Sequence, residues 1–116
     1  MFNELLLNGD AFQSTAADNA TATVTRAAVG NVRHFIGGIA ADYSAAVSAI
    51  KTITVTRVTN GTTVTLVYRW DFGKGPFLHN FPLMLHGDYN TAVSVALEAS
   101  GTGGTTGRAT IFCASL

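Results

Sequence analysis

The dipeptide Asn60-Gly61 constrains the fold of this chain more than any other short segment, because it predicts a β-hairpin at a defined position. Both central residues of a two-residue type I′ turn need positive φ, and Asn-Gly is the pair that adopts this geometry most readily. The flanking segments, residues 51–59 and 62–70, alternate apolar and hydroxyl side chains, as half-buried strands do. With Asn60-Gly61 as the turn, residues whose numbers sum to 121, as 60 and 61 do, should pair across an antiparallel hairpin.

This register divides the side chains of the hairpin between two faces. One face carries Lys51, Ile53, Val55, Arg57, Val64, Leu66, Tyr68 and Trp70. The other face is mostly threonine. A shift by one residue would mix the two sets, so the turn chemistry and the side-chain pattern support the same register. We therefore expect the aliphatic and aromatic residues of the first face to be buried.

Further short strands are predicted on both sides of the hairpin. They cover residues 20–28, 33–41, 77–81, 83–86, 92–99 and 108–114. Gly37-Gly38 suggests a bulge, and Pro82 suggests an edge position or a break between elements. Residues 42–50 fit either a short helix or a loop, whereas residues 100–107 read as a flexible loop. About eight short strands at this spacing predict an all-β, antiparallel sandwich or barrel.

The first nineteen residues differ from the rest because they show no strand alternation. We expect residues 1–19 to form an N-terminal arm, loosely ordered or docked on a neighbour, and residues 20–116 to form one β-domain. The apolar residues of the arm are the candidate contacts with a neighbouring chain or subunit: Phe2, Leu5, Leu6, Leu7 and Phe12. The arm lacks the features of a signal peptide.

Charge is scarce in this chain. Charged residues make up 12% of the 116 residues and the formal net charge is zero, so little repulsion opposes assembly with other chains. The basic residues are spread along the sequence without a basic stripe, which argues against a nucleic-acid partner. No segment approaches the roughly 20 apolar residues of a membrane span. The single cysteine, Cys113, excludes an internal disulfide framework and should be a small core residue.

No segment carries an enzyme motif, and we expect neither catalysis nor a cofactor. Asp71-Phe72-Gly73 matches a kinase triplet, but residues 71–75 read as a turn between strands. His34, His79 and His86 leave open a metal site, although no HxH or HExxH spacing supports one. Otherwise they are strand-end histidines at a surface or subunit contact.

Aromatic residues gather in sequence at the end of the hairpin and just beyond it: Tyr68, Trp70, Phe72 and Phe77. Exposed aromatic rings at loop edges can stack on sugars. Tyr68 and Trp70 share the apolar face of the hairpin, however, so a role as core or interface anchors is the stronger interpretation.

The C-terminal half carries a resemblance. The segment GPFLHNFPLMLHGDYNTAVSVALEASGTGGTTGRATIF, residues 75–112, resembles small proteins encoded in the structural gene modules of tailed bacteriophages. The similar part begins near Ala20. The resemblance implies a β-sandwich of jelly-roll type that acts as a virion structural protein, most simply a head decoration or cement protein. It implies the major capsid protein and further copies of the chain, as a dimer or trimer, as partners. It also implies synthesis in the host cytoplasm and a final place on the capsid surface.

Three alternatives remain open at this point. The chain could be a knob of a phage fibre or other virion appendage that binds glycans or a receptor, with exposed aromatic residues in the loops 71–75 and 100–107. It could be a metal-dependent hydrolase that uses His34, His79 and His86. It could also be a stand-alone cytosolic domain with no virion role.

Overall fold

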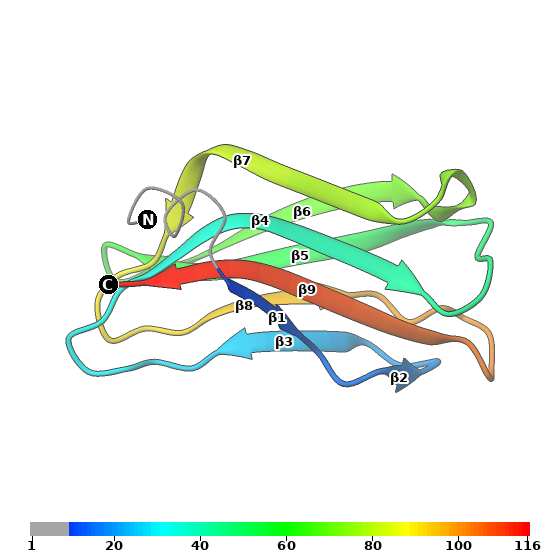
Figure 1. The fold of residues 1–116 in the computed structure, drawn as a ribbon, viewed down its shortest axis with the longest axis horizontal. Coiled ribbons are helices and arrows are strands. Elements are labelled where there is room, and N and C mark those ends of the chain that lie inside the picture. Colours follow the sequence, from blue (N-terminus) through cyan, green and yellow to red (C-terminus); the bar gives the residue numbers. More distant parts are fainter. Residues whose placement is uncertain (1–9) are drawn as a thin grey trace.

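The computed structural model describes residues 10–116 as two antiparallel β-sheets packed face to face (Figure 1). This confirms the predicted all-β, sandwich-like fold. The elements are β1 (Asp10–Gln13), β2 (Ala17–Asp18), β3 (Ala22–Arg26), β4 (His34–Tyr43), β5 (Ile50–Thr59), β6 (Thr62–Asp71), the short 3-10 helix η1 (Phe72–Lys74), β7 (Phe77–His86), β8 (Val93–Leu97) and β9 (Thr106–Ser115).

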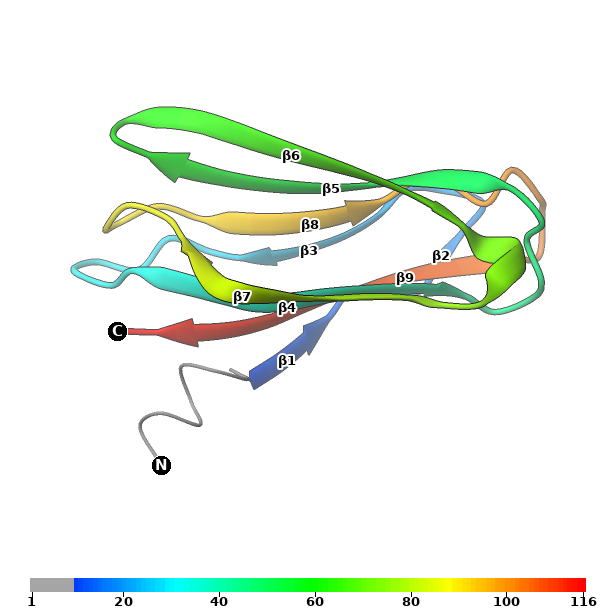
Figure 2. The same cartoon turned by 90° about the horizontal axis from the view of Figure 1, so that it is seen from above.

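The strand order of each sheet follows from a nested pairing of the chain. One sheet, sheet A, has the order β1-β9-β4-β7, with β2 also on β9, and sheet B has the order β3-β8-β5-β6. The outermost pair in sequence is β1 with β9, followed by β3 with β8, β4 with β7 and β5 with β6. The two sheets form two separate layers when the molecule is seen from above (Figure 2).

The central hairpin has the predicted register. β5 and β6 pair from Ile50 with Asp71 through to Thr59 with Thr62, and in every pair the residue numbers sum to 121. Asn60 and Gly61 have φ values of 52° and 74°, as a type I′ turn requires. The predicted division of faces also holds, because Ile53 and Val55 are fully buried and Leu66, Tyr68 and Trp70 pack against the core.

The core lies between the inner faces of the two sheets. Its fully buried aliphatic residues come from four strands, β4, β5, β8 and β9: Ile36, Ile39, Ile53, Val55, Val93, Val95, Leu97 and Ile111. Cys113 is also buried there, as predicted, and burial raises the pKa of its thiol. Alternation along β5, β8 and β9 brings these residues to one side because successive side chains of a strand point to opposite faces.

Two irregularities lie where glycine and proline predicted them. The register of β4 shifts between Ile36 and Gly38 against both of its neighbours, so the Gly37-Gly38 bulge is confirmed. A Cβ on Gly38 would come within 2.8 Å of the Asn80 side chain and 3.1 Å of the His79 carbonyl, which explains the need for glycine. β7, which contains Pro82, is the outermost strand of sheet A. Residues 44–49, where helix or loop was left open, form a loop.

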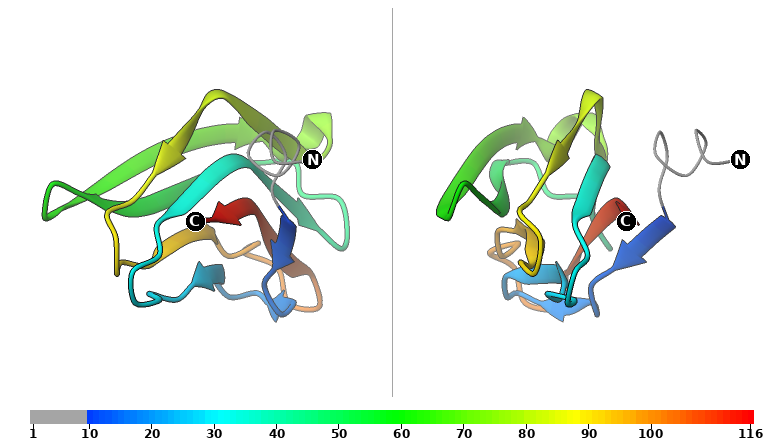
Figure 3. Two further views of the ribbon diagram at one scale, coloured as in Figure 1. Left: turned by 60° about the vertical axis from the view of Figure 1, so that its left-hand side comes forward. Right: turned by 90° about the vertical axis from the view of Figure 1, so that its left-hand side faces the viewer.

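The N-terminal segment differs from the expectation for residues 10–18. β1 and β2 are paired with β9 and extend sheet A (Figure 3), although this segment was expected to belong to the arm. The pairing partner lies about a hundred residues later in the chain, and Asp10–Gln13 is too short to show an alternating pattern of its own.

Candidate functional site

The candidate contact residues of the arm fall into two groups. Phe2, Leu5, Leu6 and Leu7 lie outside the described residues. Phe12 lies in β1 opposite Ile111, packs against the core and has the guanidinium of Arg26 over its ring at 3.7 Å. The side chain of Phe12 therefore packs within the domain, and the candidate contacts with a partner are reduced to the other four residues.

The three histidines have separate roles. His34 is buried, in contrast to the expected surface position, with Nε2 2.8 Å from the Ala27 carbonyl oxygen and Nδ1 2.7 Å from the Ser115 hydroxyl. His79 stacks among aromatic rings of β6 and β7, with Tyr68 at 5.2 Å and Phe81 at 4.9 Å between ring centres. His86 ends β7 at the surface. Residues 10–116 contain no group of three or more His, Cys, Asp or Glu side chains that could hold a metal ion.

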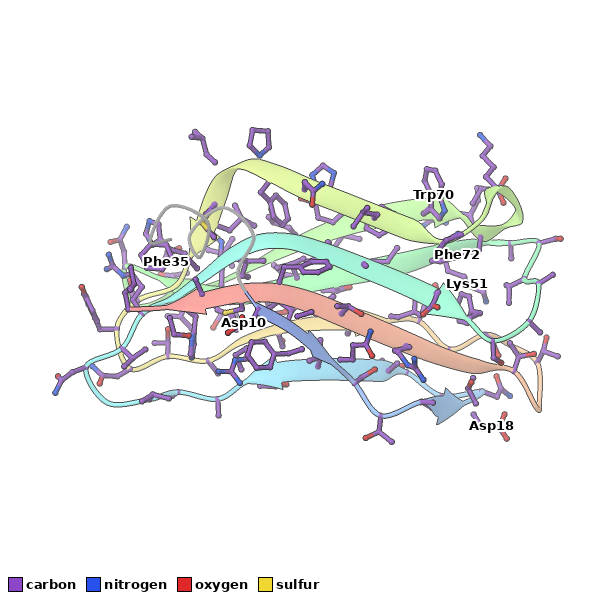
Figure 4. All side chains as sticks on the ribbon, viewed as in Figure 1. Asp10, Asp18, Phe35, Lys51, Trp70 and Phe72 are labelled. Atoms are coloured by element: carbon purple, nitrogen blue, oxygen red, sulfur yellow. The ribbon has the colours of Figure 1, made fainter. Side chains whose placement is uncertain are left out.

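The aromatic residues around the hairpin close one side of the sandwich. Tyr68 and Trp70 of β6 meet Phe77 of β7 at 6.2 Å and 5.9 Å between ring centres. The indole Nε1 of Trp70 donates to the Gly75 carbonyl oxygen at 2.9 Å, beside η1 (Figure 4). These rings are anchors between the edges of the two sheets, as the stronger interpretation of the sequence held.

The loops that a glycan-binding knob would use do not display aromatic rings. Phe72 is buried and packs edge-on against Tyr43, with 4.9 Å between ring centres. Residues 100–107 contain no aromatic residue. The turn at residues 71–75 is a capped 3-10 turn, since the Asp71 carboxylate accepts from the Gly73 N–H at 2.9 Å, and it matches the prediction of a turn between strands.

A carboxylate braces the tip of the central hairpin. Asp88, in the loop between β7 and β8, accepts hydrogen bonds from the backbone N–H of Gly61 at 2.8 Å and of Asn60 at 3.0 Å. These two bonds hold the pKa of Asp88 below its usual value. Arg57 adds a second brace by donating from Nη1 to the His86 carbonyl oxygen at 2.7 Å. Asp88 and Gly61 belong to different turns, 27 residues apart, so local sequence pattern could not predict this contact.

A second carboxylate braces the opposite end of β5. Glu98 accepts from the backbone N–H of Thr52 at 2.9 Å, and its other oxygen lies 3.6 Å from Lys51 Nζ. The Thr52 bond is the first cause that lowers the pKa of Glu98, followed by Lys51. Tyr43 donates to the Glu98 carbonyl oxygen at 2.6 Å, and burial together with the Glu98 charge raises the pKa of Tyr43 to about 12.

A hollow of about 480 Å³ lies at this end, between residues 42–47 and residues 72–76. Among its lining residues, Asp42 is the only carboxylate, Tyr43 already donates to Glu98, and the Ser44 hydroxyl accepts from the Thr106 N–H at 2.9 Å. Its lining includes no histidine, cysteine or lysine that could activate a nucleophile. The hollow therefore lacks the paired groups of a hydrolytic site.

The outer face of sheet B is a regular array of hydroxyl groups. The register aligns Thr25, Ser94, Thr56 and Thr65 in one row, and Thr23, Ala96, Thr54 and Val67 in the next. β6 forms the free edge of this array, and Val67 is 60% exposed there. Such a surface can pair or pack with another chain. The two rows contain no acidic, basic or thiol side chain that could activate a nucleophile.

Comparisons with family models, with curated proteins and with solved structures returned no match. Within residues 10–116, no helix is long and apolar enough to cross a membrane.

Proposed function

We propose that the chain is a virion structural protein that binds the outside of a bacteriophage head as a decoration or cement protein. The observation that carries this proposal is the nested pairing of β1 with β9, β3 with β8, β4 with β7 and β5 with β6. A jelly roll has this arrangement, because a long antiparallel hairpin folds over on itself as two Greek keys. Jelly rolls are widespread among capsid proteins.

The use of the polar side chains supports the same proposal. Asp88 and Glu98 brace turns and strand ends through backbone N–H groups, and His34 has both ring nitrogens engaged. Such contacts stiffen a scaffold, as a protein that reinforces a shell requires. The zero net charge and the 12% share of charged residues suit dense packing on a lattice.

The proposed mechanism is linkage between binding and shell stability. A protein that binds only the mature shell stabilises it by the free energy of binding, and many copies on one particle add their contributions. The arm residues Phe2, Leu5, Leu6 and Leu7 precede β1, which runs along the outer edge of sheet A. From that edge the arm would lie across neighbouring capsid subunits.

The pairing of β1 and β2 with β9 determines which residues can be deleted to test the arm. Removal of residues 1–19 would also delete β1 and β2 and uncover β9, so a loss of binding would have two causes. Removal of residues 1–9 leaves both strands in place. A second variant keeps the full length of the chain and replaces Leu5, Leu6 and Leu7 with serine.

The binding assay uses undecorated heads of the phage that encodes the chain, with occupancy measured by gel densitometry and cryo-electron microscopy. We expect both variants to keep the wild-type unfolding midpoint and to lose at least about tenfold in shell affinity. Wild-type occupancy by the variant without residues 1–9 would exclude the arm as the contact. No binding of the intact chain to these heads would contradict the proposed function itself.

A further inference from the structure

The free edge of β6 is the feature of the described chain that the proposed function does not yet use. β6 spans ten residues, is the outermost strand of sheet B and pairs with β5 without a register shift. An outer strand of this kind presents a row of unpaired N–H and C=O groups to any other extended chain.

The hairpin turn determines which backbone groups are free. In a hairpin with a two-residue turn, the residues flanking the turn, Thr59 and Thr62, form a hydrogen-bonded pair, and such pairs recur at every second position. The even-numbered residues of β6 therefore bond to β5. The N–H and C=O groups of Thr63, Thr65, Val67 and Arg69 point away from the sheet. Within residues 10–116, no backbone hydrogen bond joins these four residues to a loop or turn.

The other sheet edges of the described chain are each interrupted or short. β7 contains Pro82, and residues 81–84 lie between the pairs of Leu85 with Ile36 and of Asn80 with Gly38. The other edge of sheet A, next to β9, consists of two separate short strands, β1 and β2. β3 is only five residues long. Proline, irregularity and shortness are the devices that protect an edge from pairing, and β6 has none of them.

We infer that β6 is a dimerisation edge that pairs antiparallel with β6 of a second copy of this chain. Its occupant must be a long, regular strand with a free edge of its own, and within residues 10–116 β6 itself meets this requirement best. Antiparallel pairing of a strand with itself follows a two-fold axis and makes an isologous interface, the commonest kind in soluble oligomers. The inference goes beyond the proposed function and does not depend on a shell.

The free groups restrict the register of this pairing. Hydrogen-bonded pairs across the new interface need outward N–H and C=O groups on both strands, so the axis must place odd-numbered residues opposite odd-numbered residues. With the axis at Val67, Val67 faces its own copy, Thr65 faces Arg69 and Thr63 faces Asp71. This register gives about ten hydrogen bonds, opposes no like charges and covers a valine that is 60% exposed in the single chain. An axis at Thr65 would instead bring Gly61 of the turn opposite Arg69.

Two substitutions at Val67 test the edge. Val67→Pro removes an N–H that points outward and leaves the bonds between β6 and β5 unbroken. Val67→Lys places a charge opposite its own copy at the axis. The matched control is Leu78→Lys, because Leu78 is 62% exposed and lies on β7, the edge of the other sheet.

The measurement is sedimentation velocity of the 116-residue chain over a concentration series, with circular dichroism to establish that each variant is folded. We expect a wild-type dimer, an increase of at least about tenfold in the dimer dissociation constant for Val67→Lys and for folded Val67→Pro, and no change for Leu78→Lys. A wild-type chain that stays monomeric up to about 100 µM would overturn the inference. So would a dimer that is unchanged by Val67→Lys or that Leu78→Lys dissociates.

Discussion

The guanidinium of Arg26 lies 3.7 Å from the centre of the Phe12 ring, and this contact joins the edge strand of sheet A to the edge strand of sheet B. It closes one open side of the sandwich. The opposite side is closed by the rings of Tyr68, Trp70 and Phe77 between β6 and β7. Aromatic rings therefore close both long sides of the core. On the side of Phe12, the guanidinium of Arg26 also covers the ring.

A double-mutant cycle of Phe12→Leu and Arg26→Ala should reveal a favourable coupling between the two side chains. We expect a coupling of about 0.5–2 kcal/mol in the free energy of unfolding, since the pair is partly shielded from solvent. Urea unfolding of the four proteins measures it. The control cycle is Arg33 with Tyr89, a pair at 4.4 Å whose tyrosine is 53% exposed. A larger coupling in the control would show that shielding is not what strengthens the contact.

Gly61→Ala should destabilise the chain by about 1–2 kcal/mol, because an L-residue at φ 74° is strained in the left-handed backbone conformation. A Cβ at Gly61 would have no atom within 4 Å, so the cost is conformational and not steric. Gly103→Ala is the control, since its Cβ also has open space and its φ is not positive. Chemical denaturation compares the two, and equal midpoints would contradict the type I′ geometry.

Asp88→Asn should lower stability at neutral pH and lose its effect in acid. The hydrogen bonds from Gly61 and Asn60 depress the folded-state pKa of Asp88 below its ordinary value of 3.8. The stabilisation is therefore complete above that ordinary value and is lost as the pH falls through the lower, folded-state pKa.

Thermal unfolding of wild type and Asp88→Asn from pH 7 to pH 2 measures this effect. The difference between the two proteins should narrow below about pH 4. Asp42→Asn, at the exposed end of β4, controls for the loss of one negative charge. A difference that stays constant down to pH 2 would show that the carboxylate charge is not what holds the turn.

His34→Ala should cost about 2–4 kcal/mol, because it leaves a cavity and removes the hydrogen bond to the Ala27 carbonyl oxygen. In the neutral ring Nε2 carries the proton, since the Ala27 carbonyl oxygen can only accept, and Nδ1 accepts from the Ser115 hydroxyl. Ser115→Ala removes only the second bond and should cost about 1 kcal/mol. The nitrogen chemical shifts of the ring report the tautomer, and a proton on Nδ1 alone would contradict this assignment.

Local sequence patterns predicted the hairpin because its turn and its two strands are adjacent in the chain. The bulge at Gly37-Gly38 and the edge position of the Pro82 strand were also predictable, since glycine and proline act on their own backbone.

The pairing of β1 with β9 was not predictable from such patterns, because neither Asp10–Gln13 nor its surroundings indicate a partner so far away. The brace between Asp88 and Gly61 was missed for the same reason. It joins two turns 27 residues apart, and each turn alone satisfies ordinary turn statistics. Phe12 was assigned to the arm because its apolar side chain had no place in a local strand pattern. In the structure Phe12 packs against the core, with the guanidinium of Arg26 over its ring. Binding to a phage head stays a prediction.

The nested order of strands has a consequence for folding during synthesis on the ribosome. β9 lies between β1 and β4 in the middle of sheet A, yet the ribosome makes it after every other strand of the sandwich. Until β9 emerges, β1 and β2 have no partner and β4 has only β7. The central hairpin and its pairing with β8 can form earlier, but sheet A must wait. Nascent chains are therefore exposed to aggregation through unpaired strands of sheet A during synthesis, and a cell that makes this protein in quantity has to complete each chain quickly or shield it with chaperones.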